Sequence, residues 1–318
     1  MRVLKQRMPI DIAGWPIDQE FAVFPQGARA KEAVFSPVTP DQDCLVSTKR
    51  YLFKRSRLSY PDQYWAEVVA YRVGCAFGVE VPPAFASWNS TTGTCGALIE
   101  WFYEDGEESC VLAGDFLTQD HSGFDRERGT THNLKDNESL LRSLSQAGAL
   151  SADGWRQWWV NALAFDALIG NTDRHQDNWA ILFKTNQTEV PGQPIARLSP
   201  LFDNGTSLGH ERFMDRVQGW DEGRINKFIS KGTHKVKWSL DEPMIVGHFD
   251  LLKRALTEWP ETSPSLSAMV ARLSLDEIRA SIEDLLYLDL PVPFSKQRYQ
   301  FICKLLAARL LNLKQITQ

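Results

Sequence analysis

The chain has 318 residues, which is long enough for one large hydrophobic core or for two lobes. Its 43% hydrophobic and 24% charged residues are ordinary proportions for a soluble globular protein. The net charge of −5 gives no reason to expect a nucleic-acid partner through bulk electrostatics. Five cysteines, an odd number without a C-x-x-C pair, indicate reduced thiols and argue against a disulfide framework or a zinc site.

The sequence contains no pattern typical of membrane insertion or export. No apolar run approaches the roughly 18 residues that a membrane span requires. Pro9 and Asp11 interrupt any hydrophobic core of a signal peptide. We therefore expect a cytoplasmic protein with no membrane partner, and delivery into a host cell as an effector stays open.

The first third of the chain has the pattern of β-structure. Residues 21–24 and 33–35 predict two strands, joined by a turn that contains Gly27, Ala28, Arg29 and Lys31. The small residues let backbone N–H groups approach an anion, and the two basic side chains add positive charge. The same residues also fit a plain hairpin turn with exposed basic side chains.

A strand and a helix are expected next. Residues 44–53 predict a strand that ends directly before Lys54, which could reach nucleotide phosphates or could belong to a solvated basic cluster. Apolar residues at helical spacing predict a helix from residue 61 to residue 77, closed by Gly78. Glu67 lies beside the apolar face of this helix. There it either caps the solvated flank or pairs with a lysine of the neighbouring sheet.

The composition changes from β-rich to helical near residue 103. Residues 96–102 predict a strand, and an acidic, turn-rich run follows it. We therefore expect a β-rich N-lobe over residues 1–102 and a mainly helical C-lobe over residues 103–318. Residues 111–150 are polar, and residues 120–137 have almost no apolar anchor, so we expect a long loop that is disordered or faces a substrate.

Two polar turns dominate the middle of the chain. An apolar helix is expected over residues 155–169, and Gly170 can terminate it in the left-handed conformation. The first turn places Asp173 and Asn178 five positions apart, directly before a predicted strand at 179–183. A second predicted strand, 196–202, ends at Asp203. If these strands pair as a hairpin, Asn178 and Asp203 meet at one end of it, with Asp173 close by.

This arrangement fits phosphoryl transfer. One carboxylate, that of Asp173, can orient the attacking hydroxyl, while the amide oxygen of Asn178 and the carboxylate of Asp203 can hold Mg²⁺. Each turn alone is weak support, because Asn, Asp and Gly are frequent in turns for conformational reasons. A rival is a hydrolytic metal site at His175 and Asp177, but such centres usually take at least two histidines and only one lies here.

The remaining sequence predicts an irregular segment followed by helices. Residues 206–240 alternate basic and aromatic side chains, so this segment either receives a substrate or packs its aromatic rings on the core. Ser274 and Glu277 form a capping-box pattern that opens a helix to about residue 288. Residues 298–315 have the apolar periodicity of a core-facing helix.

The stretch NTDRHQDN at residues 171–178, together with LSPLFD at residues 198–203, resembles the HipA-type serine/threonine kinases of bacterial toxin–antitoxin systems. The resemblance runs over most of residues 21–210. It implies an α+β, two-lobed, protein-kinase-like fold that binds ATP and Mg²⁺ between its lobes. It also implies transfer of the γ-phosphate to a Ser or Thr of a bacterial protein, such as an aminoacyl-tRNA synthetase, and an antitoxin protein as a second partner.

The resemblance assigns a role to each matching position. Asp173 corresponds to the catalytic Asp, and Asn178 and Asp203 correspond to the Mg²⁺ ligands. The positions implied to bind nucleotide are Gly27, Ala28, Arg29, Lys31, Lys54, Glu100, Trp101, Phe102, His175, Asn178 and Asp203.

Three features depart from the family. Arg29 stands where the family has Gln in its phosphate loop, and Phe24 stands where the family has a self-inhibitory Ser. The extra N-terminal subdomain of full-length members has no counterpart in the chain. Two other functions stay open at this point: a phosphotransferase acting on a small molecule or lipid headgroup, and a nucleotide-binding regulatory pseudokinase.

Overall fold

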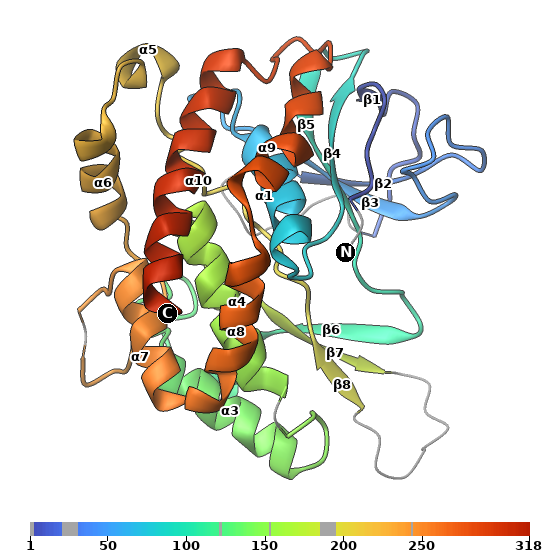
Figure 1. Cartoon of the computed structure of the whole chain (residues 1–318). Helices are drawn as coiled ribbons and strands as arrows, with labels where there is room; N and C mark the ends of the chain where they lie inside the picture. Colours follow the sequence, from blue (N-terminus) through green and yellow to red (C-terminus); the bar gives the residue numbers. More distant parts are fainter. Residues whose placement is uncertain (1–2, 21–30, 121–122, 153, 185–194, 243) are drawn as a thin grey trace. The chain divides into compact units, whose positions relative to one another are not determined.

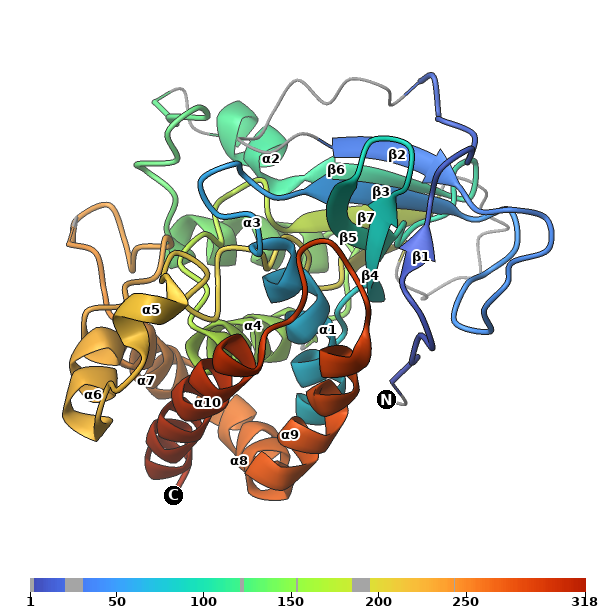
Figure 2. The same ribbon diagram turned by 90° about the horizontal axis from the view of Figure 1, so that it is seen from above.

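The computed structural model describes residues 3–20, 31–120, 123–152, 154–184, 195–242 and 244–318 (Figures 1 and 2). The chain divides into two compact units that interleave along the sequence. Unit 1 comprises Met1–Trp101, Asn204–Asp221 and Leu273–Ala307, and unit 2 comprises Phe102–Asp203, Glu222–Arg272 and Ala308–Gln318. The division into lobes that the sequence predicts after residue 102 stays a prediction.

Unit 1 contains a five-stranded sheet in the order β1-β4-β5-β3-β2. Its strands are β1 (Ile10–Asp11), β2 (Lys31–Phe35), β3 (Arg50–Arg55), β4 (Ala84–Asn89) and β5 (Thr94–Glu100). All neighbours are antiparallel except β1 and β4. In the register of the sheet, Lys54 lies between Lys31 on β2 and Ala97 on β5. One face of the sheet is closed by a buried core that includes Tyr51 and Phe85.

The helix α1 (Tyr64–Phe77) packs against β4, β5 and α9 (Leu275–Ile282) (Figures 1 and 2). All but one of its residues are buried, which explains its nearly continuous apolar sequence. Gly78 has a φ of 90° and ends the helix as predicted. The helix begins at Tyr64 and not at residue 61. The capping box at the start of α9 is confirmed, because both of its reciprocal hydrogen bonds are present.

Unit 2 contains a three-stranded antiparallel sheet in the order β6-β7-β8 (Figure 1). Its strands are β6 (Glu108–Leu112), β7 (Ala180–Lys184) and β8 (Ala196–Leu198). The predicted pairing of the two later strands is confirmed, with Ile181 opposite Leu198, although β8 is shorter than residues 196–202. The predicted apolar helix is α4 (Gly154–Ile169), and Gly170 follows it with a φ of 67°.

The remaining helices are mostly found in the C-terminal half. They are α2 (Ala113–Asp120), α3 (Leu134–Gln146), α5 (Met214–Val217), α6 (Glu222–Ser230), α7 (His248–Glu258), η1 (Pro260–Thr262), α8 (Ser263–Arg272), η2 (Glu283–Tyr287) and α10 (Lys296–Ile316). In unit 2, α4 packs against α7 and α8. The final core-facing helix that the sequence predicts is confirmed as α10. The helix predicted to reach residue 288 changes to the 3-10 form of η2 after α9.

The expectation that residues 111–150 are irregular is wrong, because α2 and α3 lie within this range. Within the loop expected at residues 120–137, the described residues 123–133 form no helix or strand. The side chain of Asn133 accepts a hydrogen bond from the backbone of Asp136 and so caps α3. Buried Leu134 and Leu141 then fix the helix on the core. The irregular segment expected over residues 206–240 likewise contains α5 and α6.

The β-strand predictions are wrong in several places, and strands β1 and β6 were not predicted. Residues 44–49 are not a strand; β3 begins at Arg50, because a turn precedes it in which Thr48 has a positive φ of 52°. Strand β4 was not predicted, and β5 ends at Glu100, before residue 102. The strand expected at residues 21–24 lies outside the described residues.

The cysteines and the apolar helices bear on two further expectations. All five cysteines are unbonded, as their odd number and spacing predict. In the part of the chain that the structure describes, no helix combines the length and the apolar character needed to cross a membrane.

Candidate active site

The turn between α4 and β7 is held together by its own polar groups. The side-chain oxygen of Asn171 accepts a hydrogen bond from the backbone N–H of Asp173, at 3.1 Å. The amide nitrogen of Asn178 donates to the carbonyl oxygen of Asp173, at 2.6 Å. Among the described residues, none hydrogen-bonds to the half-buried carboxylate of Asp173 or to Oδ1 of Asn178. These oxygens are therefore available to an acceptor hydroxyl and to a cation.

A single buried guanidinium group joins the two polar turns. Nη1 of Arg174 donates to the carbonyl oxygen of Asn178, at 3.0 Å, and to that of Phe202, at 2.5 Å. Arg174 is fully buried, so both bonds lie away from water. Asp203 directly follows Phe202, and the arginine therefore ties the backbone of the first turn to the residue preceding Asp203.

The guanidinium is in turn fixed by Asp166, a fully buried residue of α4. Oδ1 of this carboxylate accepts from Nη2 of Arg174 at 2.8 Å and from Asn171 at 3.0 Å. Oδ2 accepts from Nε of Arg174 at 3.1 Å and from Nε2 of His234 at 3.0 Å. Burial alone would raise the pKa of Asp166, but Arg174 and His234 outweigh it and hold the pKa below its ordinary value. The carboxylate therefore stays ionised.

Two further buried histidines support the same turn. Nε2 of His248 donates to the carbonyl oxygen of Asn171, at 2.6 Å. Nε2 of His132 accepts from Asn137 at 3.0 Å and from the indole of Trp179 at 3.3 Å. Burial lowers the pKa of each histidine to about 3, so both rings are neutral at physiological pH. Both histidines therefore make these hydrogen bonds as uncharged imidazole rings.

The second polar turn has an unusual backbone at Asp203. This residue is half-buried and has a φ of 55°, in the left-handed region that favours glycine. The ring of the preceding Phe202 stacks on Phe102, with centroids 5.1 Å apart and planes 22° apart. Residues held in such conformations concentrate at functional sites. The positive φ of Asp203 therefore marks its carboxylate as a candidate functional group.

The rival metal site at His175 and Asp177 has little support in the geometry. The carboxylate of Asp177 pairs with Nη2 of Arg126 at 2.9 Å, and Arg126 also pairs with Asp115 at 3.0 Å. Burial raises the pKa of Asp177, although Arg126 offsets part of that effect. Nδ1 of His175 accepts a backbone hydrogen bond from Asp177. The described residues contain no group of three or more His, Cys, Asp or Glu side chains arranged for a metal ion.

Unit 1 carries a second charged group predicted to bind nucleotide. Lys54 is only 2% exposed, which rejects the solvated basic cluster, and its ammonium lies 2.7 Å from Oε1 of Glu67. The other oxygen of Glu67 accepts a hydrogen bond from the backbone N–H of Asn204, at 2.9 Å. Of the two alternatives for Glu67, pairing with a lysine of the sheet is therefore confirmed.

The other predicted nucleotide-binding residues are spread along the chain. Lys31 begins β2, and Glu100 ends β5. The backbone N–H of Trp101 donates to the carbonyl oxygen of Arg50, at 3.1 Å. Gly27, Ala28 and Arg29 of the predicted phosphate loop lie outside the described residues. The nucleotide-binding roles of all these residues stay predictions.

Two solved structures are similar to the chain over nearly its whole length. The proinflammatory kinase CtkA of Helicobacter pylori matches with a TM-score of 0.73 and 16% identity, over 97% of this chain and 96% of that one. HipA of Shewanella oneidensis, solved with HipB and its operator DNA, matches with a TM-score of 0.51 and 13% identity. That match covers 96% of this chain and 69% of HipA. The chain has a HipA-like kinase fold. No family model and no curated protein match the sequence.

This kinase-like α+β fold is the fold class that the sequence predicts. The buried network that supports the turn at residues 171–178 was not predicted, although part of it left a signal in the sequence. Asp166 is the one charged residue between Trp158 and Ile169, and an acidic residue inside an apolar helix must find a buried partner. Arg174 is the nearest arginine that follows it. His234 comes 68 residues after Asp166, and no local pattern connects the two.

Proposed function

We propose that this protein is an ATP- and Mg²⁺-dependent serine/threonine protein kinase. The observation that carries the proposal is the bridge made by Arg174, which bonds to the backbone of both polar turns. Through this bridge, one side chain contacts both Asn178 and Phe202, the residue before Asp203. The HipA-like kinase fold of the chain supports the same function. The order along the sequence, carboxylate, amide and carboxylate, is the order that kinase chemistry uses.

The donor atoms fit a magnesium ion. Because the amide nitrogen of Asn178 is committed to the carbonyl of Asp173, its oxygen is the atom left for a cation. Asp203 adds a carboxylate, and Mg²⁺ prefers such oxygen ligands. In this proposal Asn178 and Asp203 hold the metal. MgATP, when bound, supplies the transferred phosphoryl group and the positive charge that offsets its negative charge.

The protein's own side chains then have distinct roles. Asp173 accepts a hydrogen bond from the acceptor hydroxyl, orients it and takes its proton. Lys54 provides a point charge for the nucleotide phosphates, and the buried contact with Glu67 fixes its position. The backbone around Trp101 and Phe102 would contact adenine. A regulatory pseudokinase would need none of the proton-accepting chemistry, so the accessible carboxylate of Asp173 favours the enzyme.

Phosphopeptide mass spectrometry on cells expressing wild type or Asp173→Asn tests the assignment. We expect Ser and Thr phosphopeptides with wild type only, because asparagine cannot take the proton. The Asp173→Asn protein should keep its thermal shift with MgATP, whereas Asp203→Ala should lose the Mg²⁺-dependent part. The exposed Asp276→Asn is the matched control. Full activity of Asp173→Asn would refute the role of this residue.

Radiolabelled transfer to a cell lysate separates the acceptor classes. Label in the protein fraction supports the kinase, and label confined to small molecules or lipids identifies the alternative phosphotransferase. Because the structure of Shewanella HipA includes HipB, we also propose an antitoxin-like protein partner for this chain. A stoichiometric partner that suppresses the transfer supports this proposal, and a purified partner without effect on transfer contradicts it.

A further inference from the structure

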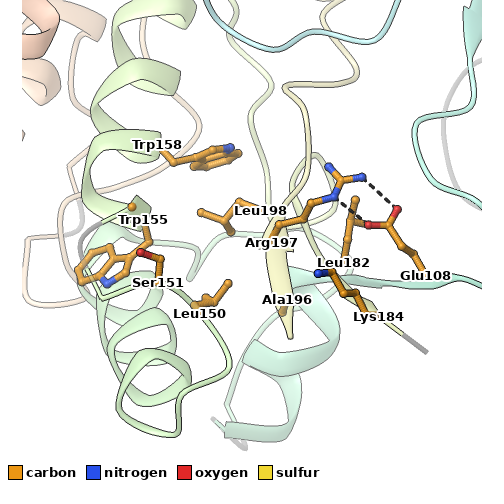
Figure 3. Close-up of a pocket in the computed structure, with 11 residues that line it drawn as sticks. Glu108, Leu150, Ser151, Trp155, Trp158, Leu182, Lys184, Ala196, Arg197 and Leu198 are labelled. Carbon is orange, nitrogen blue, oxygen red and sulfur yellow. Dashed lines mark hydrogen bonds and ion pairs between the residues drawn. The ribbon is translucent and has the colours of Figure 1, made fainter. Parts of the chain in front are cut away.

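A cavity of about 450 Å³ opens within unit 2 (Figure 3). It lies between the start of α4 with the loop before it and the β7–β8 hairpin. None of the described residues predicted to bind nucleotide or metal lines it. The proposed active site therefore does not account for this cavity.

The cavity has an apolar interior with a fixed aromatic wall. Leu150 and Leu182 are buried in it, while Trp158 and Leu198 are half-buried and still reach solvent. The indole nitrogen of Trp158 donates to the carbonyl oxygen of Ser199, at 3.0 Å, which fixes the orientation of the ring. Figure 3 shows Leu198 below the ring of Trp158. This interior suits a large apolar side chain.

Charged residues border one side of the cavity, away from Ser151 (Figure 3). Arg197 forms a two-pronged pair with Glu108, from Nε at 2.8 Å and from Nη2 at 3.0 Å. Lys184 is exposed, and its ammonium group makes no ion pair within the described residues. Glu108, Arg197 and Lys184, the charged side chains among the described lining residues, therefore sum to one net positive charge, which is complementary to an acidic group.

We propose that this cavity is a docking site for an extended acidic segment of the protein substrate. A large apolar side chain of that segment fills the cavity, and a neighbouring Asp or Glu pairs with Lys184. A small-molecule site usually encloses most of its ligand. Here the Arg197 side chain is 41% exposed and Lys184 is exposed, so the border is open to the flanking residues of a peptide. The docked segment serves as substrate only if the proposed kinase function holds.

Fluorescence polarisation with the full chain tests binding in the absence of nucleotide. The probes are fluorescein-labelled 12-residue peptides of Gly and Ser that carry one Leu, Phe or Trp and one Glu, one to three positions apart. Matched peptides carry Lys in place of Glu. We expect the Glu peptides to bind more tightly than the Lys peptides, with a difference that shrinks at high salt because the charges are exposed.

Variants of the cavity locate the binding. Leu198→Ala should weaken the tightest peptide about tenfold, since it removes apolar contact area. Lys184→Gln should weaken it about three- to fivefold, the range of an exposed ion pair, and should abolish the preference for Glu over Lys. The matched controls are the exposed Leu311→Ala on α10 and Lys253→Gln on α7, which should bind like wild type.

The outcomes for docking and for catalysis are distinguishable. If no peptide binds, or if both cavity variants bind like wild type, the docking proposal is overturned. Binding of the peptide by an Asp173→Asn protein that transfers no phosphate supports docking and catalysis as separate functions. The tightest peptide can then be joined to a Ser- or Thr-containing sequence that the wild-type protein is found to phosphorylate. This fusion should lower the KM of that acceptor at least fivefold with kcat unchanged, and Leu198→Ala should cancel the gain.

Discussion

Replacing Asp166 with Asn tests whether one buried carboxylate holds the catalytic turn. The two oxygens of Asp166 accept hydrogen bonds from Arg174, Asn171 and His234, all of which are buried. Asparagine keeps the size but removes the charge and turns one acceptor into an NH₂ group that faces donors. Arg174 would then be buried without a counter-charge. Removing one partner of a buried ion pair costs about 3–5 kcal/mol of unfolding free energy.

This cost converts to a measurable change in Tm. An unfolding entropy of about 2.1 cal/mol/K per residue gives about 0.7 kcal/mol/K for a cooperatively unfolding chain of this length. We therefore expect Asp166→Asn to lower the Tm by about 4–8 °C in differential scanning calorimetry. The control is Asp276→Asn, whose carboxylate is 91% exposed and should change the Tm by about 1 °C at most. An equal shift in both variants would refute the argument.

Hydrogen exchange separates positioning of the turns from a general loss of stability. Because Arg174 bonds to the backbone of Asn178 and Phe202, loosening it should raise exchange at residues 171–178 and 199–204. Strand β4 belongs to the other unit and supplies none of the hydrogen bonds named above, so it should exchange as in wild type. A uniform rise in both regions would show that Asp166 acts only on global stability.

Three further predictions follow from the buried groups. Burial lowers the pKa of His132 and His248 to about 3, against about 6.5 in the unfolded chain. Between these two pKa values the unfolded chain binds more protons than the folded one, so the free energy of unfolding is highest above pH 6.5 and falls as the pH drops below it. Urea unfolding should show a loss of about 2 kcal/mol per histidine at pH 5, and a flat profile from pH 5 to 7.5 would contradict this. In a double-mutant cycle, Lys54→Met and Glu67→Gln together should destabilise the protein less than the sum of the single changes, because either single change already removes the ion pair that the two side chains share. Additive effects would disprove their coupling. Gly170→Ala should cost at least about 1–2 kcal/mol by chemical denaturation, since φ is positive and a Cβ would lie 2.5 Å from a buried guanidinium; an unchanged denaturation midpoint would refute this.

Much of the fold was predictable where a local pattern decides the structure. Helices α1, α4 and α10 show apolar residues on the face or faces that they bury, and glycines with positive φ end α1 and α4. The capping box of α9 needs only two residues three positions apart. Such signals do not depend on the rest of the chain. The conformation that each local signal predicts is kept in the folded chain, because the tertiary contacts favour the same conformation.

The segment around α3 shows why the remainder could not be predicted. His132, Asn133 and Asn137 are polar and read as a solvated loop, yet all three are fully buried. Their partners include one another and Trp179, which lies far along the chain. A polar residue can be buried once its hydrogen bonds are satisfied, and the sequence does not show where those partners will be.

The candidate site divides in the same way. The spacing of Asp173 and Asn178 is local, and the hairpin that brings the second turn near follows from two adjacent strands. The buried network behind them depends on contacts from α4 and from the segment after α6. Sequence reasoning could therefore name the candidate catalytic and metal-binding residues, but it did not identify the buried residues that hold their turns in position.

Glu67 contacts two parts of unit 1 that bear on the candidate site. Lys54 pairs with Glu67 at 2.7 Å, and Glu67 also accepts a hydrogen bond from the backbone N–H of Asn204, directly after Asp203. One carboxylate thus connects the predicted phosphate-binding lysine to the chain segment of a predicted metal ligand. A shift of α1 would therefore displace both at once. Under the proposed function, a change at Glu67 should therefore perturb the lysine and the metal-binding turn together.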